Sequence, residues 1–209
     1  MAGDRIPIRA LVLDYGEVLC APPSPEAVGR LADVAGVQRE TLEPAYWGHR
    51  ADYDRGTLDG PAYWDLVGGD LGLSLSAPQV EALVAADTAL WSVLDRPMLD
   101  WAAQVAQDGL PLALLSNMVK EIGIHLRDEL RLFDGFTHVA YSYELGVIKP
   151  EPEIYAHVLA ALSIGPEDVL FVDDREVNVL AARALGWHAI VFRGRKSLVA
   201  ELETGYVLA

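Results

Sequence analysis

Residues 9–14 read Arg-Ala-Leu-Val-Leu-Asp, and this short stretch decides the fold. The apolar run is too short for a helix and lies between Pro7 and Gly16, two residues that interrupt regular structure. It therefore predicts a buried strand that ends at a charged residue, Asp14. Similar apolar runs recur at 111–116, 137–141, 168–173 and 188–192, which gives five candidate strands.

Helical patterns separate the later strands. One covers 152–162 and opens at Pro152, and the clearest covers 176–185 and stops before Gly186. The second pattern is expected to face the core with its helically spaced apolar residues, Val177, Leu180, Ala181, Ala184 and Leu185. Strands that alternate with helices form parallel sheets covered on both faces. We therefore predict an α/β fold with a doubly wound, Rossmann-like parallel sheet as its core.

Residues 21–95 interrupt this alternation. They open with Pro22-Pro23-Ser24-Pro25 and contain no strand pattern, but they show at least three amphipathic helical patterns, near 28–35, 62–71 and 80–87. We predict an α/β core made of residues 1–20 and 96–209, and an inserted all-helical cap made of residues 21–95. The insertion follows the first strand, at the edge where open α/β sheets bind ligands. Its tryptophans are expected to pack the helices together: Trp47, Trp64 and Trp91.

The composition excludes several classes of protein. The chain of 209 residues is 52% hydrophobic, which is enough to build a core, and its 16 Lys and Arg against 31 Asp and Glu give a net charge of −15. That charge repels nucleic acids and anionic membranes. The charged start and the lack of an apolar stretch near ~18 residues favour a cytoplasmic protein without a membrane partner. The lone Cys20 excludes an internal disulfide. No oligomeric state is predicted.

Polar residues stand where the predicted strands end. They are Asp14, Ser116, Asn117, Asp173 and Asp174, and Lys149 follows a further short apolar run. Because the carboxyl ends of parallel strands meet at one edge, three carboxylates would share one crevice, which is costly unless a cation neutralises them. Oxygen ligands favour Mg²⁺. The sequence therefore predicts a magnesium site at this edge of the sheet.

Four motifs in this order resemble those of the haloacid dehalogenase-like (HAD) hydrolases. They are Leu-Asp-Tyr-Gly-Glu-Val-Leu at 13–19, Leu-Ser-Asn at 115–117, Gly-Val-Ile-Lys-Pro at 146–150, and Val-Asp-Asp at 172–174 followed by Asn178. The resemblance covers essentially the whole chain and is strongest to the branch that contains alpha-D-glucose-1-phosphate phosphatase. It implies a Mg²⁺-dependent phosphatase that hydrolyses a small phosphorylated metabolite, with a sugar phosphate as the expected substrate, through an aspartyl-phosphate intermediate.

The resemblance also implies metal ligands. Asp14 would be both the nucleophile and a ligand of Mg²⁺. Asp174 would bind the ion directly, and Asp173 would bind it directly or through water. The backbone carbonyl of Gly16 would be a further ligand. As an alternative, Asp174 is a plain N-cap of the helix that follows it.

The two middle motifs would bind the phosphoryl group. Ser116, with Asn117 beside it, would donate hydrogen bonds to phosphoryl oxygens, and Lys149 would balance the charge between Asp14 and the transferring group. The alternatives are that Ser116 and Asn117 only form a turn and that Lys149 is an ordinary solvated lysine. Asn178, one helical turn after Asp174, would orient the acidic loop or have no special role.

One position departs from the family pattern. Most of its phosphatases carry a second Asp two residues after the nucleophile as the acid/base, and here that position is Gly16. The alternative function is therefore a catalytically weak or inactive relative that binds a ligand or a partner. Glu17 is the nearest spare carboxylate, and the polar segment 49–55 either contacts substrate or is a solvated connection. The pair Asp173-Asp174 argues against dehalogenation, because true dehalogenases carry a different fourth motif.

Overall fold

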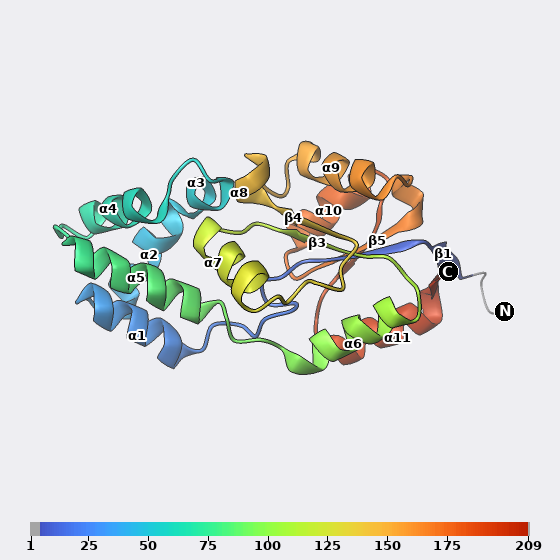
Figure 1. Ribbon diagram of the computed structural model, residues 1–209, viewed down its shortest axis with the longest axis horizontal. Coiled ribbons are helices and arrows are strands. Elements are labelled where there is room, and N and C mark those ends of the chain that lie inside the picture. The colour runs from blue at the N-terminus through green and yellow to red at the C-terminus, as the bar shows by residue number, and fades with distance from the viewer. Residues whose placement is uncertain (1–4, 209) are drawn as a thin grey trace.

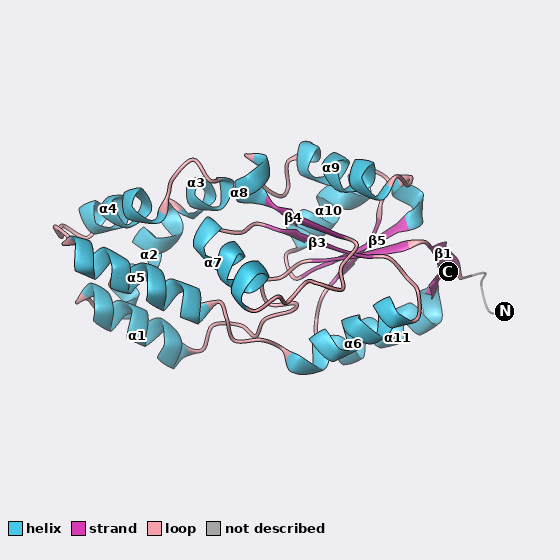
Figure 2. Cartoon of the chain, viewed as in Figure 1, coloured by secondary structure: helices cyan, strands magenta, loops and turns pink. Residues whose placement is uncertain are grey.

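The computed structural model describes residues 5–208, so the charged start at residues 1–4 lies outside the described part. Its centre is a parallel five-stranded sheet in the order β4-β3-β2-β5-β6 (Figures 1 and 2). The strands are β2 (Ala10–Leu13), β3 (Leu112–Ser116), β4 (His138–Tyr141), β5 (Val169–Asp173) and β6 (His188–Val191). The five predicted strands and the α/β fold class are confirmed.

The strand register brings the carboxyl ends together. Leu13 at the end of β2 pairs with Leu114 on one side and with Val172 on the other. The amide of Asp14 continues the ladder by donating to the carbonyl of Val172 at 2.9 Å. The residues that follow β2, β3 and β5 therefore lie at one edge of the sheet.

Helices cover both faces of the sheet, as a parallel sheet requires. One face packs against α6 (Arg96–Gln107) and α11 (Arg195–Gly205), and the other packs against α9 (Pro152–Leu162) and α10 (Glu176–Ala184). Alternate residues of each strand point to opposite faces, so Leu13 of β2 belongs to the first layer and Val12 to the second. Figure 1 shows the two helix layers on either side of the sheet.

The buried face of α10 differs from the predicted one. The helix buries Asn178, Val179 and Ala182, whereas Val177 and Leu180 are 49% and 54% exposed. The apolar pattern was wrong here because Asn178, a polar residue, turns inward to bond the acidic loop and fixes the rotation of the helix.

Residues 25–90 contain five helices between β2 and α6. They are α1 (Pro25–Ala35), α2 (Arg39–Gly48), α3 (Arg50–Arg55), α4 (Gly60–Asp70) and α5 (Ala77–Leu90). Polar residues start several of them: Ser24 accepts a hydrogen bond from the amide of Ala27 at 3.2 Å, and Asp59 accepts one from Ala62 at 2.9 Å. The helices lie beyond one end of the sheet in Figure 1.

Two adjacent segments join these helices to the sheet. Cys20 and Leu94 form an isolated antiparallel bridge. Ala21 donates its amide to Val93 at 2.7 Å, and Asp95 donates its amide to Leu19 at 3.0 Å. The chain thus leaves and re-enters the sheet layer at one place.

The remaining elements are short. A two-stranded parallel pair joins β1 (Ile6–Ile8) to β7 (Tyr206–Leu208) and was not predicted. The others are α7 (Lys120–Ile124), α8 (Ser142–Leu145), the π-helix η1 (His125–Glu129) and the 3-10 helix η2 (Pro166–Asp168). Among residues 5–208, no helix has the length and apolar character needed to cross a bilayer.

Candidate active site

Asp14 lies directly after the central strand β2 and is 6% exposed. Its Oδ1 accepts hydrogen bonds from the amide of Tyr15 at 2.7 Å and pairs with the Nζ of Lys149, also at 2.7 Å. These contacts hold the carboxylate at the edge where three strands end. A carboxylate held in this way can attack an electrophile that enters from the open side.

Lys149 connects this carboxylate to a second one. Its ammonium is 2.8 Å from Oδ2 of Asp173 and donates to the carbonyl of Leu115 at 2.9 Å. Burial by itself lowers the pKa of Lys149, but the carboxylates of Asp14 and Asp173 outweigh burial and raise the pKa above its usual value. Lys149 is 3% exposed and stays charged, so it is not the solvated lysine of the alternative interpretation.

Asp173 is fully buried at the end of β5. Its Oδ1 accepts from the amide of Arg175 at 2.8 Å, and the amide nitrogen of Asn178 lies 3.0 Å from both of its oxygens. Asn178 therefore orients Asp173, one of the two roles left open by the sequence. The N-cap of α10 is Arg175 rather than Asp174, which leaves the Asp174 side chain free of a capping role.

Three carboxylates meet at this edge and fit a divalent cation. One oxygen each from Asp14, Asp173 and Asp174 lies within 4.8 Å of the others. Burial and the charge of Asp173 together raise the pKa of Asp14 to about 7 and that of Asp174 to about 6, even though Lys149 lowers both. The single ammonium of Lys149 thus does not neutralise the cluster. In addition, Oδ1 of Asn178 is buried beside it without a hydrogen-bond partner among the described residues. An all-oxygen donor set of this kind suits Mg²⁺.

Ser116 and Asn117 occupy the loop after β3 but differ in what they face. Ser116 is 1% exposed, and its hydroxyl donates to the backbone carbonyl of Asn117 at 3.3 Å. Asn117 lines the cavity, yet its side chain bonds both backbone groups of Lys149: Nδ2 donates to the carbonyl at 3.0 Å, and Oδ1 accepts from the amide at 2.7 Å. Asn117 thereby fixes the loop that carries Lys149.

The loop after Asp14 carries Gly16 and Glu17. Both line the cavity, and Glu17 adopts a left-handed backbone with φ of 53°. A Cβ placed on Gly16 would lie 3.8 Å from Cζ3 of Trp91, an ordinary van der Waals contact. The glycine is thus not required by close packing against a neighbouring backbone.

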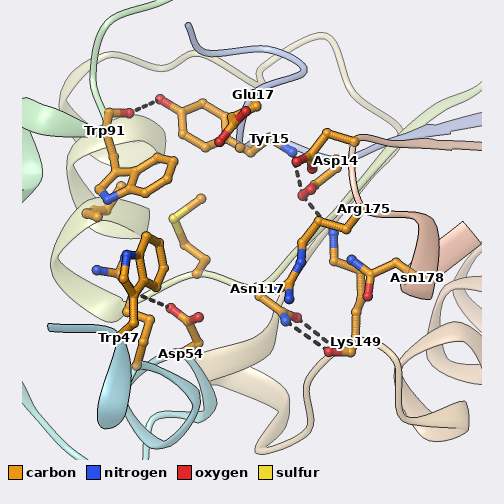
Figure 3. A pocket seen from close by; sticks show the side chains of 15 residues that line it. Asp14, Tyr15, Glu17, Trp47, Asp54, Trp91, Asn117, Lys149, Arg175 and Asn178 are labelled. Atoms are coloured by element: carbon orange, nitrogen blue, oxygen red, sulfur yellow. Dashed lines mark hydrogen bonds and ion pairs between the residues drawn. The ribbon is translucent and has the colours of Figure 1, made fainter. Parts of the chain in front are cut away.

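A cavity of about 370 Å³ opens in front of this cluster (Figure 3). Its wall includes residues from both parts of the chain: Asp14, Lys149, Asp174, Arg175 and Asn178 from the sheet edge, and Trp47, Arg50, Asp54 and Trp91 from the inserted segment between residues 25 and 95. The volume is in the range of small-molecule sites. Of the three tryptophans expected to pack helices, only Trp64 is fully buried; Trp47, 55% exposed, and Trp91 line the cavity.

A buried polar cluster supports the far wall of this cavity. Arg50 is 8% exposed; its Nη1 lies 3.1 Å from Oδ2 of Asp87, and its Nε donates to Oδ1 of Asp54 at 3.0 Å. Tyr46 donates its hydroxyl to Asp87 at 2.7 Å and also contacts Arg50. Arg50 and Asp54 belong to the polar segment 49–55, so that segment is not merely a solvated connection.

Several cavity residues were not singled out from the sequence. Arg50 and Asp54 belong to the polar segment 49–55, for which substrate contact was one of two alternatives, but they lie on α3, a six-residue helix too short to show a periodic pattern. Trp47 lies at the end of α2, a helix that contains Pro44 and was therefore not predicted. Arg175 follows the Asp-Asp pair directly, and its position next to that motif was the available signal.

Comparisons with known proteins agree on one family. Residues 8–186 match the sequence profile of the haloacid dehalogenase-like hydrolases. The chain is 34% identical over 116 residues to bifunctional epoxide hydrolase 2 of Rattus norvegicus, an alignment that covers 53% of the chain and 21% of that relative. It is 28% identical over 183 residues to a sesquiterpene phosphatase of Aspergillus oryzae, which covers 85% of the chain and 86% of the relative.

A solved structure shares the fold. The magnesium complex of a HAD family enzyme from Bacteroides thetaiotaomicron superposes with a TM-score of 0.76 at 24% identity, over 92% of this chain and 98% of that one. At this identity the likeness shows a common fold alone. The chain spans 21–36% of the length of several curated relatives that it matches, including the rat epoxide hydrolase.

Proposed function

This chain belongs to the haloacid dehalogenase-like hydrolase family, and from that premise we propose that it is a Mg²⁺-dependent phosphatase of a small phosphorylated metabolite. The observation that carries the proposal is the position of Lys149, whose ammonium lies 2.7 Å from Asp14 and 2.8 Å from Asp173 beside an open cavity. A carboxylate nucleophile, a fixed cation and a metal-binding acidic cluster are the groups that phosphoryl transfer needs.

In the proposed first step, one oxygen of Asp14 attacks the phosphorus of the substrate. The bond from phosphorus to the leaving oxygen breaks, and an aspartyl phosphate forms on Asp14. Lys149 stabilises the negative charge that remains on the phosphoryl oxygens. Ser116 and Asn117 are proposed as further contacts of the phosphoryl group. Asn117 holds the loop that carries Lys149, and Ser116 lies one residue before Asn117 at the end of β3.

We propose that Mg²⁺ is held by Asp14 and Asp174, by the backbone carbonyl of Gly16, and by Asp173 directly or through water. The ion would neutralise the acidic cluster and polarise the phosphoryl group. Asn178 supports this arrangement because it fixes the orientation of Asp173. In the proposed second step, water attacks the phosphorus of the aspartyl phosphate, releases inorganic phosphate and restores the Asp14 carboxylate.

The helices inserted after β2 are proposed to act as the cap, with residues 21–95 as the cap and residues 1–20 and 96–209 as the core. The adjacent segments at Cys20 and Leu94 support this division, because the chain enters the inserted helices after Cys20 and leaves them before Leu94. Trp47 and Trp91 give the cavity two aromatic surfaces, and Asp54 and Arg175 give it polar groups. This combination suits a sugar phosphate, the substrate class expected from the sequence.

The decisive experiment measures phosphate release from para-nitrophenyl phosphate with and without Mg²⁺. Wild type is expected to need the ion, and Asp14→Asn is expected to be inactive but folded, because an amide cannot act as the nucleophile. Undiminished turnover by the variant would contradict the aspartyl-phosphate mechanism. A wild type that is inactive on every compound in a screen of phosphorylated metabolites would favour the alternative, a relative that binds a ligand without turning it over. That alternative rests on Gly16, which stands where the acid/base Asp is usual.

A further inference from the structure

We propose that Asp54, a cap residue, is the general acid and base that replaces the carboxylate missing at Gly16. This inference rests on the proposed phosphatase function and adds a catalytic residue to it. Asp54 lies on α3, far in sequence from every motif of the sheet edge, yet it lines the same cavity as Asp14 and Lys149. Figure 3 shows it on the opposite wall from Asp14.

The geometry of phosphoryl transfer requires an acid on that wall. The attacking and leaving oxygens lie roughly in line with phosphorus between them. With Asp14 as the nucleophile, the leaving oxygen therefore faces away from the sheet edge and toward the cap. The proton that this oxygen needs is best supplied from the cap side, and Asp54 is the carboxylate that the cap contributes to the cavity wall.

Both the backbone and the side chain of Asp54 are held in place. The hydroxyl of Ser142, a fully buried residue of the core, donates to the backbone carbonyl of Asp54 and accepts from the amide of Met118 at 2.8 Å. The cap residue is thus tied to the loop that follows Asn117. Arg50 donates to Oδ1 of Asp54 at 3.0 Å, which leaves Oδ2 without a described protein partner.

Burial of the Asp54 carboxyl group favours its protonated form, although Arg50 opposes this. Arg50 and Asp87, which are 8% and 1% exposed, already pair with each other, and Asp87 also accepts from Tyr46. A second ionised carboxylate would leave this buried set with an excess negative charge. Burial raises the pKa of Asp54 and Asp87 raises it further, while Arg50 and, more weakly, Lys149 oppose them. A carboxyl group with a raised pKa keeps its proton to a higher pH than a free aspartate does, which suits it to act as a general acid.

The proton balance closes over the two steps. When the bond from phosphorus to the leaving oxygen breaks, the Asp54 carboxyl group gives its proton to that oxygen, and the alcohol leaves. The Asp54 carboxylate then takes a proton from the water that attacks the aspartyl phosphate. Phosphate departs, Asp14 is again a carboxylate and Asp54 is again protonated, so no further reactant is needed.

The test compares three esters of similar size: para-nitrophenyl, phenyl and benzyl phosphate. For Asp54→Asn, kcat/KM on benzyl phosphate is expected to fall by roughly 10²–10⁴-fold, because a poor leaving group needs the acid. On para-nitrophenyl phosphate it is expected to stay close to wild type. That variant should also release a burst of nitrophenolate equal to the enzyme concentration, since the aspartyl phosphate then hydrolyses slowly.

Two matched variants serve as controls. Asp52→Asn changes an exposed aspartate of the same helix and should leave all three rates unchanged. Glu17→Gln removes the other spare carboxylate of the cavity, and a selective loss on benzyl phosphate in this variant would overturn the proposal in favour of Glu17. The proposal would also be overturned if Asp54→Asn slowed the hydrolysis of all three esters equally, as the loss of a structural role would, or if it slowed the hydrolysis of none.

A measurement on wild type makes the test independent of any variant's folding. With an acid that must be protonated, kcat/KM on benzyl phosphate should decline at high pH where that on para-nitrophenyl phosphate does not. Equal profiles for the two esters would overturn the Asp54 proposal while phosphatase activity stands. A wild type that releases phosphate in Mg²⁺ neither from these esters nor from a screen of phosphorylated metabolites would overturn the proposed function itself, and the role of Asp54 with it.

Discussion

The Nζ of Lys149 lies 2.7 Å from Oδ1 of Asp14, and the two side chains are 1% and 8% exposed. Because the pair is almost entirely shielded from solvent, each charge depends on the other, and Asp173 depends on the same ammonium at 2.8 Å. A buried ion pair adds little stability over an apolar replacement, but the loss of one partner leaves a charge without compensation. Lys149 is therefore a structural element as well as a proposed catalytic one.

We predict that Lys149→Met lowers the free energy of unfolding by about 3–5 kcal/mol in the absence of divalent metal. The matched control is Lys196→Met, which removes an exposed lysine of α11 and should stay within about 0.5 kcal/mol of wild type. Urea titrations followed by circular dichroism measure both. Equal stabilities of the two variants would contradict the dependence of the carboxylates on Lys149.

Magnesium is predicted to stabilise the protein. An ion that binds only the folded state adds about 2.7 kcal/mol at a hundred times its Kd, which corresponds to a rise in Tm of roughly 5–11 °C for a chain of this size. Asp174→Ala should blunt the rise, whereas Asp100→Ala, at an exposed position of α6, should not. Thermal scans with Mg²⁺ and with EDTA give the result, and an unchanged rise in Asp174→Ala would place the ion elsewhere.

Much of the fold was predictable because its signals are local. The strands β2, β3 and β5 are short apolar runs that end at or directly before a polar residue, and such runs are recognisable without knowledge of their neighbours. The positions of Asp14 and Asp173 follow from the same signals, since parallel strands bring their carboxyl ends together. Lys149 lies in the loop between α8 and α9 rather than after a strand, and Asn117 fixes that loop at the same edge. The convergence of Asp14, Asp173 and Lys149 at one edge was expected from the sequence and is found in the structure.

The cap side of the site was not predictable for a physical reason. Arg50 pairs with Asp87, and the backbone of Asp54 is bonded by Ser142; these partners are 37 or more residues away in sequence. No local pattern records such long-range contacts. In α10 a local pattern was present but predicted the wrong buried face. The apolar stripe of the helix is exposed, because the buried hydrogen bonds of Asn178 determine which side of the helix faces the sheet.

His138 is predicted to make stability depend on pH. Burial lowers the pKa of His138 on β4, and the neighbouring His157 lowers it further. The folded state therefore binds fewer protons than the unfolded state once the pH falls to the ordinary His value of about 6.5, and stability decreases from there toward the lower folded pKa. Relative to wild type, His138→Gln should therefore gain unfolding free energy at about pH 5.5 compared with about pH 7.5. His188→Gln, on the opposite edge strand β6, is the control, and an equal gain there would contradict the prediction.

The last prediction places a carboxylate back at position 16. From the sequence alone, Gly16 predicts that turnover falls steeply as the leaving group becomes more basic, because no acid is present at the usual position. With Asp54 as the acid, turnover by wild type should instead depend only weakly on the basicity of the leaving group. The Cβ of an aspartate at position 16 meets Trp91 at 3.8 Å, so the substitution fits the backbone. Gly16→Asp is therefore expected to restore turnover of benzyl phosphate in an Asp54→Asn background, where Gly16→Ala should not.

The measurement is kcat/KM for the three esters in the single and double variants. Restoration by the aspartate and not by the alanine would show that the missing function is a proton donor, because both substitutions add the same Cβ and only one adds a carboxyl group. Two variants that restore turnover equally would instead trace the defect to the shape of the cavity. A third outcome is that neither variant restores kcat/KM for benzyl phosphate while kcat/KM for para-nitrophenyl phosphate keeps its wild-type value. In that case the carboxylate at position 16 does not reach the leaving oxygen, and the cap is the side from which the proton must come.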